Sequence, residues 1–313
     1  MLQVDSVIHT RLQSDVPLVA RISQYIIAAG GKRIRPVLLL LLSGALGQKD
    51  ARKYKLAAIV EFIHTATLLH DDVVDESTLR RGQPTANESF GNAASVLVGD
   101  FLYSRAFQMM VECKSMKIMQ ILSEATNIIA EGEVLQLMNM HDASLDQVTY
   151  LRVIRSKTAK LFEATARIAA VLADSDAKTE EACAQFGQAL GTAFQIRDDA
   201  LDYDGQQNEL GKNLGDDLRE GKVTLPLIIA IERANTQDAQ FLRQTIEQPD
   251  SNHLDHALDR VKQIIQSTKA LDATHDLAAH EAQRACAALD HFEPSDFLLA
   301  LRQLADQSIQ RKS

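Results

Sequence analysis

The amino-acid sequence predicts an all-α protein built as one domain over residues 1–313. Apolar residues recur at helical spacing along nearly the whole chain. Only 6 prolines occur, and the long stretch between Pro84 and Pro226 has none, which favours uninterrupted helices. Alanine and leucine, both strong helix formers, are abundant, and no extended alternation of apolar and polar residues indicates a strand.

Glycine and proline delimit the first three predicted helices. Residues 16–29 form a helix that ends at the Gly30-Gly31 pair. Residues 35–46 form the second, with a proline in its first turn and a glycine just after its end. Residues 51–75, rich in Ala, Ile and Leu, form the third, and its last turns carry a cluster of aspartates.

The loop ESTLRRGQPTAN, residues 76–87, follows the third helix and is marked by Gly, Pro and Asn. Beyond it, helical patterns cover residues 92–111, 115–139, 146–173, 178–204 and 222–234. The motifs that carry chemistry lie within residues 30–226. The C-terminal helices, residues 237–313, are more polar, and we expect them to pack outside the core.

Composition excludes several classes of function. The net charge of −9 disfavours nucleic-acid binding, because phosphate neutralisation requires a basic surface. The longest aliphatic run, residues 37–42, is far shorter than the roughly 20 residues of a transmembrane segment.

The cysteines Cys113, Cys183 and Cys286 match no zinc pattern or disulfide framework, which favours a reducing compartment. Since the N-terminus is polar and shows no signal peptide, we expect a soluble, cytoplasmic protein.

Two aspartate clusters share the spacing D-D-x-x-D and follow apolar helical segments. They are HDDVVDE at residues 70–76, with Asp71, Asp72 and Asp75, and RDDALDY at residues 197–203, with Asp198, Asp199 and Asp202. Residues four apart project from the same face of a helix. One such cluster is as consistent with a solvated helix end as with a metal site.

If the two helices pack side by side, six carboxylates converge, and their repulsion requires cations. Oxygen ligands select hard ions, and Mg²⁺ is typically held by one or two carboxylates and substrate phosphates.

Basic residues near glycines and helix ends indicate anion sites. They are Lys32, Arg33 and Arg35 in GGKRIRP, Arg80 and Arg81 in the loop, and Lys157 (with Thr158), Lys212 and Lys222 further on. Any one of them could be a solvated charge, but together they could form two phosphate sites. His64 lies two turns before Asp71 on the same helical face and could join one of them. A lone histidine in such a position is more often a packed core residue, but its alignment with the aspartate cluster favours anion binding.

Taken together, these motifs resemble the trans-type, head-to-tail polyprenyl diphosphate synthases. The segments GGKRIRP, EFIHTATLLHDDVVDESTLRRGQPTAN, GEVLQL, SKTAKLFE and FQIRDDALDYDG occur in that family's order within residues 28–230. The resemblance implies a helical bundle of the isoprenoid synthase type with a central active-site cavity. It implies a homodimer, Mg²⁺ as the cofactor with three ions per active site, and transient membrane contact at product release. The implied substrates are isopentenyl diphosphate and an allylic diphosphate such as farnesyl diphosphate.

The resemblance also assigns a role to each matching position. The catalytic residues it implies are Asp71, Asp75, Lys157, Gln195 and Asp198. The metal ligands would be Asp71, Asp72, Asp75, Asp198, Asp199 and Asp202. The allylic substrate would contact Arg80, Lys157, Thr158, Gln195, Lys212 and Lys222. Isopentenyl diphosphate would bind Lys32, Arg35, His64 and Arg81.

Ala66 and Thr67, five and four residues before Asp71, are the implied chain-length positions. Short-chain relatives carry bulky aromatic residues there, so small residues imply an open tunnel and a product of more than four isoprene units. Within the family, the resemblance is nearest to the bacterial members that make octaprenyl diphosphate for the ubiquinone side chain, which implies eight units.

Two positions depart from the usual family pattern. Gln83 stands where members often carry Lys, and Arg197 stands where many carry an apolar residue. We expect Arg197 to point outward or towards a partner, and neither change to abolish activity.

Four alternative functions remain open. A shorter-chain synthase, making geranylgeranyl or farnesyl diphosphate, would use the same motifs. A terpene cyclase or head-to-head synthase would share the acidic clusters, but the GGKR element argues against it. A non-catalytic regulatory subunit would usually lose acidic residues, whereas this chain keeps all six. A helical metal-binding scaffold would not require two anion sites.

Overall fold

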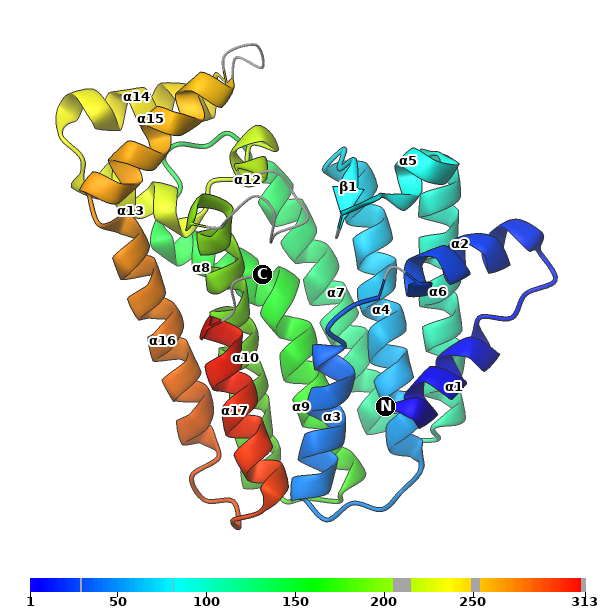
Figure 1. Cartoon of the computed structure of the whole chain (residues 1–313). Coiled ribbons are helices and arrows are strands. Elements are labelled where there is room, and N and C mark those ends of the chain that lie inside the picture. Colours follow the sequence, from blue (N-terminus) through cyan, green and yellow to red (C-terminus); the bar gives the residue numbers. More distant parts are fainter. Residues whose placement is uncertain (29, 81, 205–214, 249–253, 311–313) are drawn as a thin grey trace. The chain divides into compact units, whose positions relative to one another are not determined.

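The computed structural model describes residues 1–28, 30–80, 82–204, 215–248 and 254–310, and it confirms the predicted all-α class (Figure 1). Within these residues the only strands are β1 (Leu79–Arg80) and β2 (Gln83–Pro84), which pair antiparallel as a short hairpin. No helix of the described part of the chain is both long enough and apolar enough to cross a membrane.

The chain divides into two compact units. The first comprises Met1–Thr126, Leu161–Gly187 and Ala288–Gln303, and the second comprises Asn127–Lys160, Gln188–Ala287 and Leu304–Ser313. Five helices contribute residues to both: α7 (Met116–Met138), α9 (Lys160–Leu172), α10 (Ala177–Asp204), α16 (Ala270–Ala288) and α17 (Asp296–Gln310).

The first unit is organised around α4 (Arg52–Val74). It also contains α1 (Leu2–Arg11), α2 (Pro17–Ala28), α3 (Ile34–Ala45), α5 (Ala86–Phe90) and α6 (Asn92–Glu112). Most residues from Leu56 to Leu69 are buried on α4, which packs against α1, α3 and α6. Burial of this apolar surface is the main stabilising contribution to the helix, because most helical stability in proteins comes from tertiary packing of an apolar face.

Contacts with α6 fix the end of α4 that carries the first aspartate cluster. Ser95 donates its hydroxyl to the carbonyl of Leu69 at 3.0 Å. Gly99 makes room for the ring of His70, since a Cβ at position 99 would lie 2.3 Å from His70 Nε2. His70 therefore has a packing role. Its contact with α6 fixes the part of α4 that carries the aspartates.

The second unit contains α8 (Gln147–Ile154), the π-helical turn η1 (Arg155–Ala159), α12 (Asp216–Arg219), α13 (Leu225–Arg233), α14 (Thr236–Glu247) and α15 (Leu254–Ser267). The expectation that residues after 237 pack outside the core was wrong. Leu242, Ile246, Val261 and Ile265 are buried in a cluster with residues of α8 and α13. Their spacing gives one apolar stripe on each helix, and the polar residues on the other faces masked it in the average composition.

Three local features differ from the predicted helices. Helix α1 was not predicted, because Val4 and Ile8 are its only buried apolar residues. The helix predicted over 146–173 is interrupted by the π turn. The helix predicted from residue 222 begins at Leu225, because Pro226 is favoured in a first turn and Thr224 before it is extended.

Candidate active site

The first aspartate cluster lies at the C-terminal end of α4, in the first unit. Asp71 and Asp75 are half-buried, whereas Asp72 is 4% exposed. Arg80, on strand β1, donates to one oxygen of Asp72 from Nε at 2.9 Å and from Nη2 at 2.6 Å. Burial alone would lower the pKa of Arg80, but the charges of Asp72, Asp71 and Asp75 outweigh it and raise that pKa. The short hairpin thus places a permanent cation against the cluster.

The GGKRIRP segment lies in the same unit, at the start of α3. Lys32 is exposed, and Arg33 adopts a left-handed conformation, with a φ of 50°, as the N-cap residue of α3. Arg35 places its guanidinium over the ring of Phe162, 4.3 Å from the centroid. Its Nε is enclosed and has no hydrogen-bond partner among the described residues. Burial lowers the pKa of Arg35 to about 10, although the charge of Glu61 opposes the shift.

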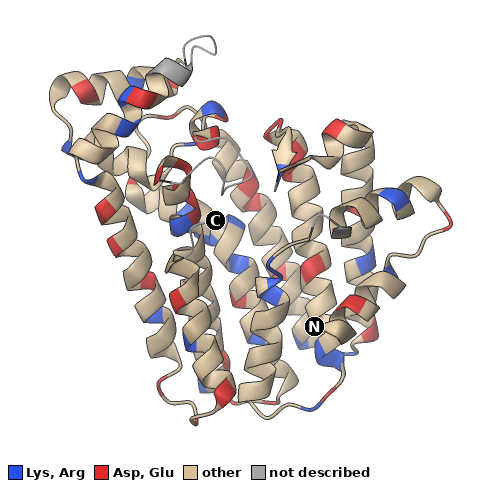
Figure 2. Ribbon diagram, viewed as in Figure 1, with Lys and Arg blue, Asp and Glu red and all other residues tan. Residues whose placement is uncertain are grey.

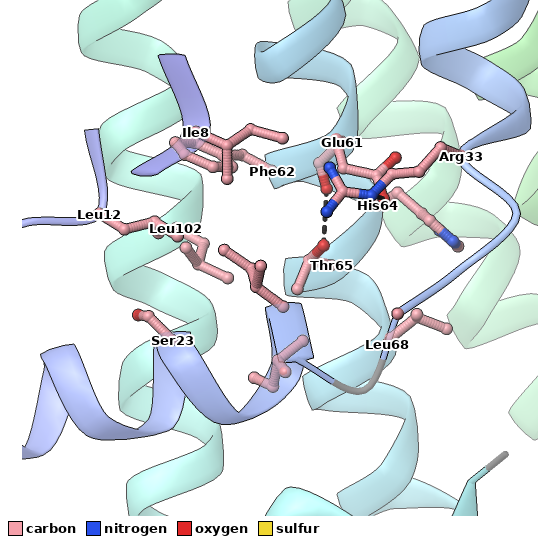
Figure 3. A pocket seen from close by; sticks show the side chains of 13 residues that line it. Ile8, Leu12, Ser23, Arg33, Glu61, Phe62, His64, Thr65, Leu68 and Leu102 are labelled. Atoms are coloured by element: carbon pink, nitrogen blue, oxygen red, sulfur yellow. Dashed lines mark hydrogen bonds and ion pairs between the residues drawn. The ribbon is translucent and has the colours of Figure 1, made fainter. Parts of the chain in front are cut away.

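An enclosed guanidinium with an unpaired Nε is unfavourable by itself and favours an anionic ligand nearby. The predicted site residues Arg81 and Lys212 lie outside the described residues. His64 is half-buried on α4 and lines a pocket together with Arg33, as Figure 3 shows. This pocket has an empty volume of about 510 Å³, including space open to solvent.

The two predicted chain-length residues are on α4 but do not line that pocket. Ala66 is fully buried, and Thr67 donates its hydroxyl to the carbonyl of His64 at 2.8 Å. The position of an elongation tunnel beside Ala66 therefore stays a prediction.

In the second unit, Lys157 and Thr158 lie on the π turn η1, between α8 and α9. Single π turns inside α-helices are frequent at functional sites, because they change the direction in which side chains project. Gly132 on α7 packs directly against this turn. A Cβ there would lie 2.8 Å from Ser156 Cβ and 2.9 Å from the backbone nitrogen of Lys157. Lys157 pairs with Glu133 at 2.6 Å, so the GEVLQL segment supports the turn from one side.

A chain of hydrogen bonds connects the π turn with the second aspartate cluster. Thr158 donates to the amide oxygen of Gln195 at 2.8 Å, and the Gln195 amide nitrogen donates to Asp199 at 2.7 Å. Tyr150 donates to the other oxygen of Asp199 at 2.5 Å. Burial, followed by the charge of Asp217, raises the pKa of Asp199 well above its usual value. These bonds fix the orientation of the Gln195 amide and of the Thr158 hydroxyl.

The three aspartates of this second cluster have different surroundings. Asp198 is exposed and Asp199 is buried. Asp202 accepts hydrogen bonds from the backbone N–H groups of residues 215, 216 and 217 at 3.1, 3.2 and 3.3 Å. Its carboxylate thereby satisfies N–H groups at the start of α12 that have no partner within the helix.

Lys222 lies in the loop that precedes α13. Its ammonium group pairs with Glu220 at 2.7 Å. The neighbouring Gly221, with a φ of +80°, packs against His141, and a Cβ there would lie 2.3 Å from that ring. His141 also donates its backbone N–H to the Gly221 carbonyl at 2.8 Å. The segment that follows α7 therefore holds the loop that carries Lys222.

The outward orientation expected for Arg197 was wrong. Its side chain is 13% exposed and contacts His275 on α16, with Nη1 at 3.0 Å from Nδ1. Burial, followed by the charge of Arg197, lowers the pKa of His275. Arg197 therefore joins α10 to α16.

Carboxylate oxygens dominate both clusters, which is the donor chemistry that Mg²⁺ prefers. Within the described residues, no three His, Cys, Asp or Glu side chains lie together closely enough to hold an ion by themselves. The carboxylate oxygens themselves fit Mg²⁺, which usually takes one or two carboxylates and completes its shell with water and phosphate oxygens. The clusters belong to different units, so their convergence on shared ions stays a prediction.

Sequence reasoning did not single out Tyr150, Glu133, Gly132 or His141. Tyr150 lies 49 residues from Asp199, and no local pattern connects them. Gly132 and Glu133 lie in the quoted GEVLQL segment, and a glycine inside a long helical pattern was a usable signal of close packing.

Comparison with known proteins gives full-length matches. The sequence profile of the family described as polyprenyl synthetase matches residues 16–265. The chain is 49% identical to octaprenyl diphosphate synthase of Escherichia coli, over 99% of this chain and 95% of that protein. It is 43% identical to an all-trans-nonaprenyl-diphosphate synthase of Rhodobacter capsulatus, over 98% of this chain and 94% of the other. A polyprenyl synthase from Caulobacter crescentus, solved in complex with calcium and isoprenyl diphosphate, has a TM-score of 0.96 and 48% identity, covering 100% and 95% of the two chains.

Proposed function

The chain belongs to the polyprenyl synthetase family, and on that premise we propose that it joins isopentenyl diphosphate head to tail to an allylic diphosphate such as farnesyl diphosphate. The product would be a long trans-polyprenyl diphosphate, with octaprenyl diphosphate, the precursor of a ubiquinone side chain, as the expected length. The supporting observation is the full-length similarity to an octaprenyl diphosphate synthase in a chain that keeps both D-D-x-x-D clusters.

The proposed cofactor is Mg²⁺, with three ions per active site. Asp72, Asp199 and Asp202 accept hydrogen bonds that hold their carboxylates in place. By the family resemblance, Asp71, Asp75 and Asp198 are the proposed direct ligands, and the other three aspartates support them. When bound, Mg²⁺ would neutralise the leaving diphosphate and act as a Lewis acid.

Isopentenyl diphosphate would be held by Lys32, Arg35, His64 and Arg81. Support comes from Arg35, whose Nε is enclosed without a hydrogen-bond partner among the described residues. Its pKa, lowered by burial to about 10, still keeps the guanidinium charged near neutral pH. Stacking on Phe162 fixes the plane in which the group could receive a phosphate.

The allylic substrate would contact Arg80, Lys157, Thr158, Gln195, Lys212 and Lys222. Lys157 and Lys222 each pair with a glutamate, Glu133 and Glu220, and a diphosphate would compete for these ammonium groups. The Thr158 hydroxyl and the Gln195 amide are fixed by their hydrogen bonds, so they could stabilise the allylic cation as preorganised dipoles. The proton lost after condensation would pass to the released diphosphate, since the proposed chemistry requires no side-chain base.

The direct test is incubation of the purified protein with labelled isopentenyl diphosphate, farnesyl diphosphate and Mg²⁺, followed by sizing of the lipid. A product of eight isoprene units is expected. A product of four units or fewer would favour the shorter-chain alternative. The absence of any condensation, with the fold intact, would favour the regulatory-subunit alternative.

Replacing Lys32 with Ala is expected to raise the KM for isopentenyl diphosphate by roughly 10- to 100-fold, because a hydrogen bond to a charged group contributes about 1.5–3 kcal/mol. The KM for farnesyl diphosphate should change little. Lys49→Ala, at another exposed lysine of the first unit, is the control. Steady-state kinetics in both substrates measure the effect, and a larger change for farnesyl diphosphate would show that the two sites were interchanged.

Replacing Gly132 with Ala is expected to lower turnover by roughly 10- to 100-fold. The new methyl group would press on the backbone of the π turn, and a shift of about 1 Å at a catalytic group costs on the order of 100-fold. Glu131→Ala, at the exposed neighbouring position, should have wild-type turnover. Unchanged turnover in Gly132→Ala would mean that catalysis does not depend on the observed positions of Lys157 and Thr158.

We further propose a cytoplasmic homodimer of a single-domain chain, with transient membrane contact at product release. Leu97 and Val111 on α6 are 66% and 60% exposed, which supports an apolar interface on that helix. Cys113 and Cys183 are buried thiols, as suits a reducing compartment. Sedimentation equilibrium tests the assembly: the wild type should sediment as a dimer and Leu97→Glu largely as a monomer.

A further inference from the structure

We propose, on the basis of the function proposed above, that Glu281 is a positioning residue for the catalytic groups of the π turn. It acts through Arg155, the first residue of the turn, which also carries Lys157 and Thr158. These four residues belong to the second unit, so their contacts are complete within it.

Glu281 is a buried carboxylate on α16. Figure 2 shows acidic and basic residues along this helix, and Asp272, Asp276 and Arg284 are exposed. Glu281, by contrast, is only 3% exposed. An ionised carboxylate is costly to bury unless cations and hydrogen bonds compensate it. Its burial therefore has to be explained by the groups that it binds.

Two guanidinium groups bind the two oxygens of Glu281. Nη2 of Arg155 donates to Oε1 at 3.0 Å, and Nη1 of Arg284 donates to Oε2 at 2.5 Å. Arg284 is three residues further along the same helix, whereas Arg155 is 126 residues away in the chain. Nε of Arg155 is enclosed and has no hydrogen-bond partner among the described residues. The bond through Nη2 therefore joins the π turn to α16.

The π turn is thus held on two sides. On one side, Gly132 of α7 packs against the backbone of Lys157. On the other side, Glu281 binds Arg155 at the first residue of the turn. Buried ion pairs often contribute little net stability, but they can select one arrangement of the chain. Because π turns are rare compared with regular helix, loss of this contact should let Lys157 and Thr158 change direction.

Helix α16 also contacts α10, which carries the second aspartate cluster. His275 on α16 lies 3.0 Å from Nη1 of Arg197 on α10. Gln195, which accepts a hydrogen bond from Thr158, is on α10 as well. One helix therefore contacts both of the elements that this hydrogen bond connects.

Glu281→Gln is expected to lower kcat by roughly 10- to 100-fold, because a shift of about 1 Å at a catalytic group costs on the order of 100-fold. The KM for isopentenyl diphosphate should stay close to that of the wild type, since its proposed ligands lie elsewhere in the chain. Steady-state kinetics with farnesyl diphosphate and Mg²⁺ separate the two constants. A wild-type kcat in this variant would overturn the positioning role alone, whereas an inactive wild type would contradict the proposed function.

Glu180→Gln is the matched control. Glu180 is 7% exposed and pairs with Lys117 and, at 2.9 Å, with Arg167, so it is also a buried carboxylate with two cationic partners. All three residues belong to the first unit, and none is a proposed site residue. Glu180→Gln should lose a similar amount of thermal stability but keep the wild-type kcat. Equal losses of kcat in the two glutamine variants would contradict the proposal.

Arg155→Ala tests the route through which Glu281 acts. The Arg155 side chain is 37% exposed, so its truncation should leave the fold intact. The loss of kcat should match that of Glu281→Gln, and the double variant should be no slower than either single variant, because all three lack the same contact. Losses that multiply in the double variant would show that Glu281 does not act through Arg155.

Amide hydrogen exchange gives a readout that does not depend on activity. Peptides that cover residues 150–162 should exchange faster in Glu281→Gln than in the wild type, because the π turn has lost one of its contacts. The same peptides should exchange at the wild-type rate in Glu180→Gln. Unchanged exchange of residues 150–162 in Glu281→Gln would overturn the proposal whatever reaction the protein catalyses.

Discussion

Replacing Asp71 with Asn is expected to lower turnover by about two to three orders of magnitude, the loss typical when one preorganised electrostatic group is removed from an active site. Asparagine keeps the size of the side chain and one of its oxygens but loses the charge that would attract Mg²⁺. The buried face of α4, from Leu56 to Leu69, is untouched, so the helical circular dichroism should stay unchanged.

Steady-state turnover at increasing Mg²⁺ concentration measures this effect, and a higher Mg²⁺ requirement should accompany the loss. Glu88→Gln, at an exposed carboxylate on α5, is the charge-matched control and should behave as wild type. Asp198→Asn applies the same test to the second cluster. Near-normal turnover in either aspartate variant would refute the metal assignment for that cluster.

Replacing Ala66 with Phe is expected to shorten the product from eight isoprene units to four or fewer. Ala66 is fully buried one turn before Asp71, where a ring would obstruct a chain that grows along α4. The ring also has to fit into a packed core, so a loss of about 1–3 kcal/mol in the free energy of unfolding should accompany the change. Chromatography of the labelled lipid measures product length.

Thr65→Phe is the matched control for this experiment. Thr65 precedes Ala66 on α4 but lines the pocket of the first unit, and adjacent positions on a helix diverge by about 100°. Product length should therefore stay at eight units in Thr65→Phe. If Thr65→Phe shortens the product and Ala66→Phe does not, the growing chain occupies that pocket instead of a tunnel beside Ala66.

Much of the fold could be predicted because its strongest helices carry local signals. The helix predicted over 51–75 is observed as α4 (Arg52–Val74), and the one over 92–111 as α6 (Asn92–Glu112). In both, apolar periodicity and flanking turn residues act together. Local signals fail where tertiary contacts decide the structure, as at α1 and at the C-terminal helices that contribute to the buried cluster.

The candidate site could likewise be predicted only in part from the sequence. The aspartate spacing and the GGKR segment indicated its chemistry, because charged residues at fixed spacing are unusual beside apolar helices. The partners of these residues could not be predicted, since Asp199 bonds to Tyr150 and Arg197 contacts His275, 78 residues away in the chain. The π turn was equally inaccessible, because nothing in Arg155–Ala159 distinguishes it locally from an ordinary helix.

The π turn also determines how a change in the length of this segment would act. A wider turn accommodates one residue more than a regular helix would in the same place. Deleting one residue from Arg155–Ala159 would therefore let the backbone close into an uninterrupted α-helix, and the buried faces of Leu161, Phe162 and Thr165 would keep their orientation. The side chains of the turn itself, Lys157 and Thr158 among them, would change direction. A one-residue deletion here should therefore cost activity more than stability.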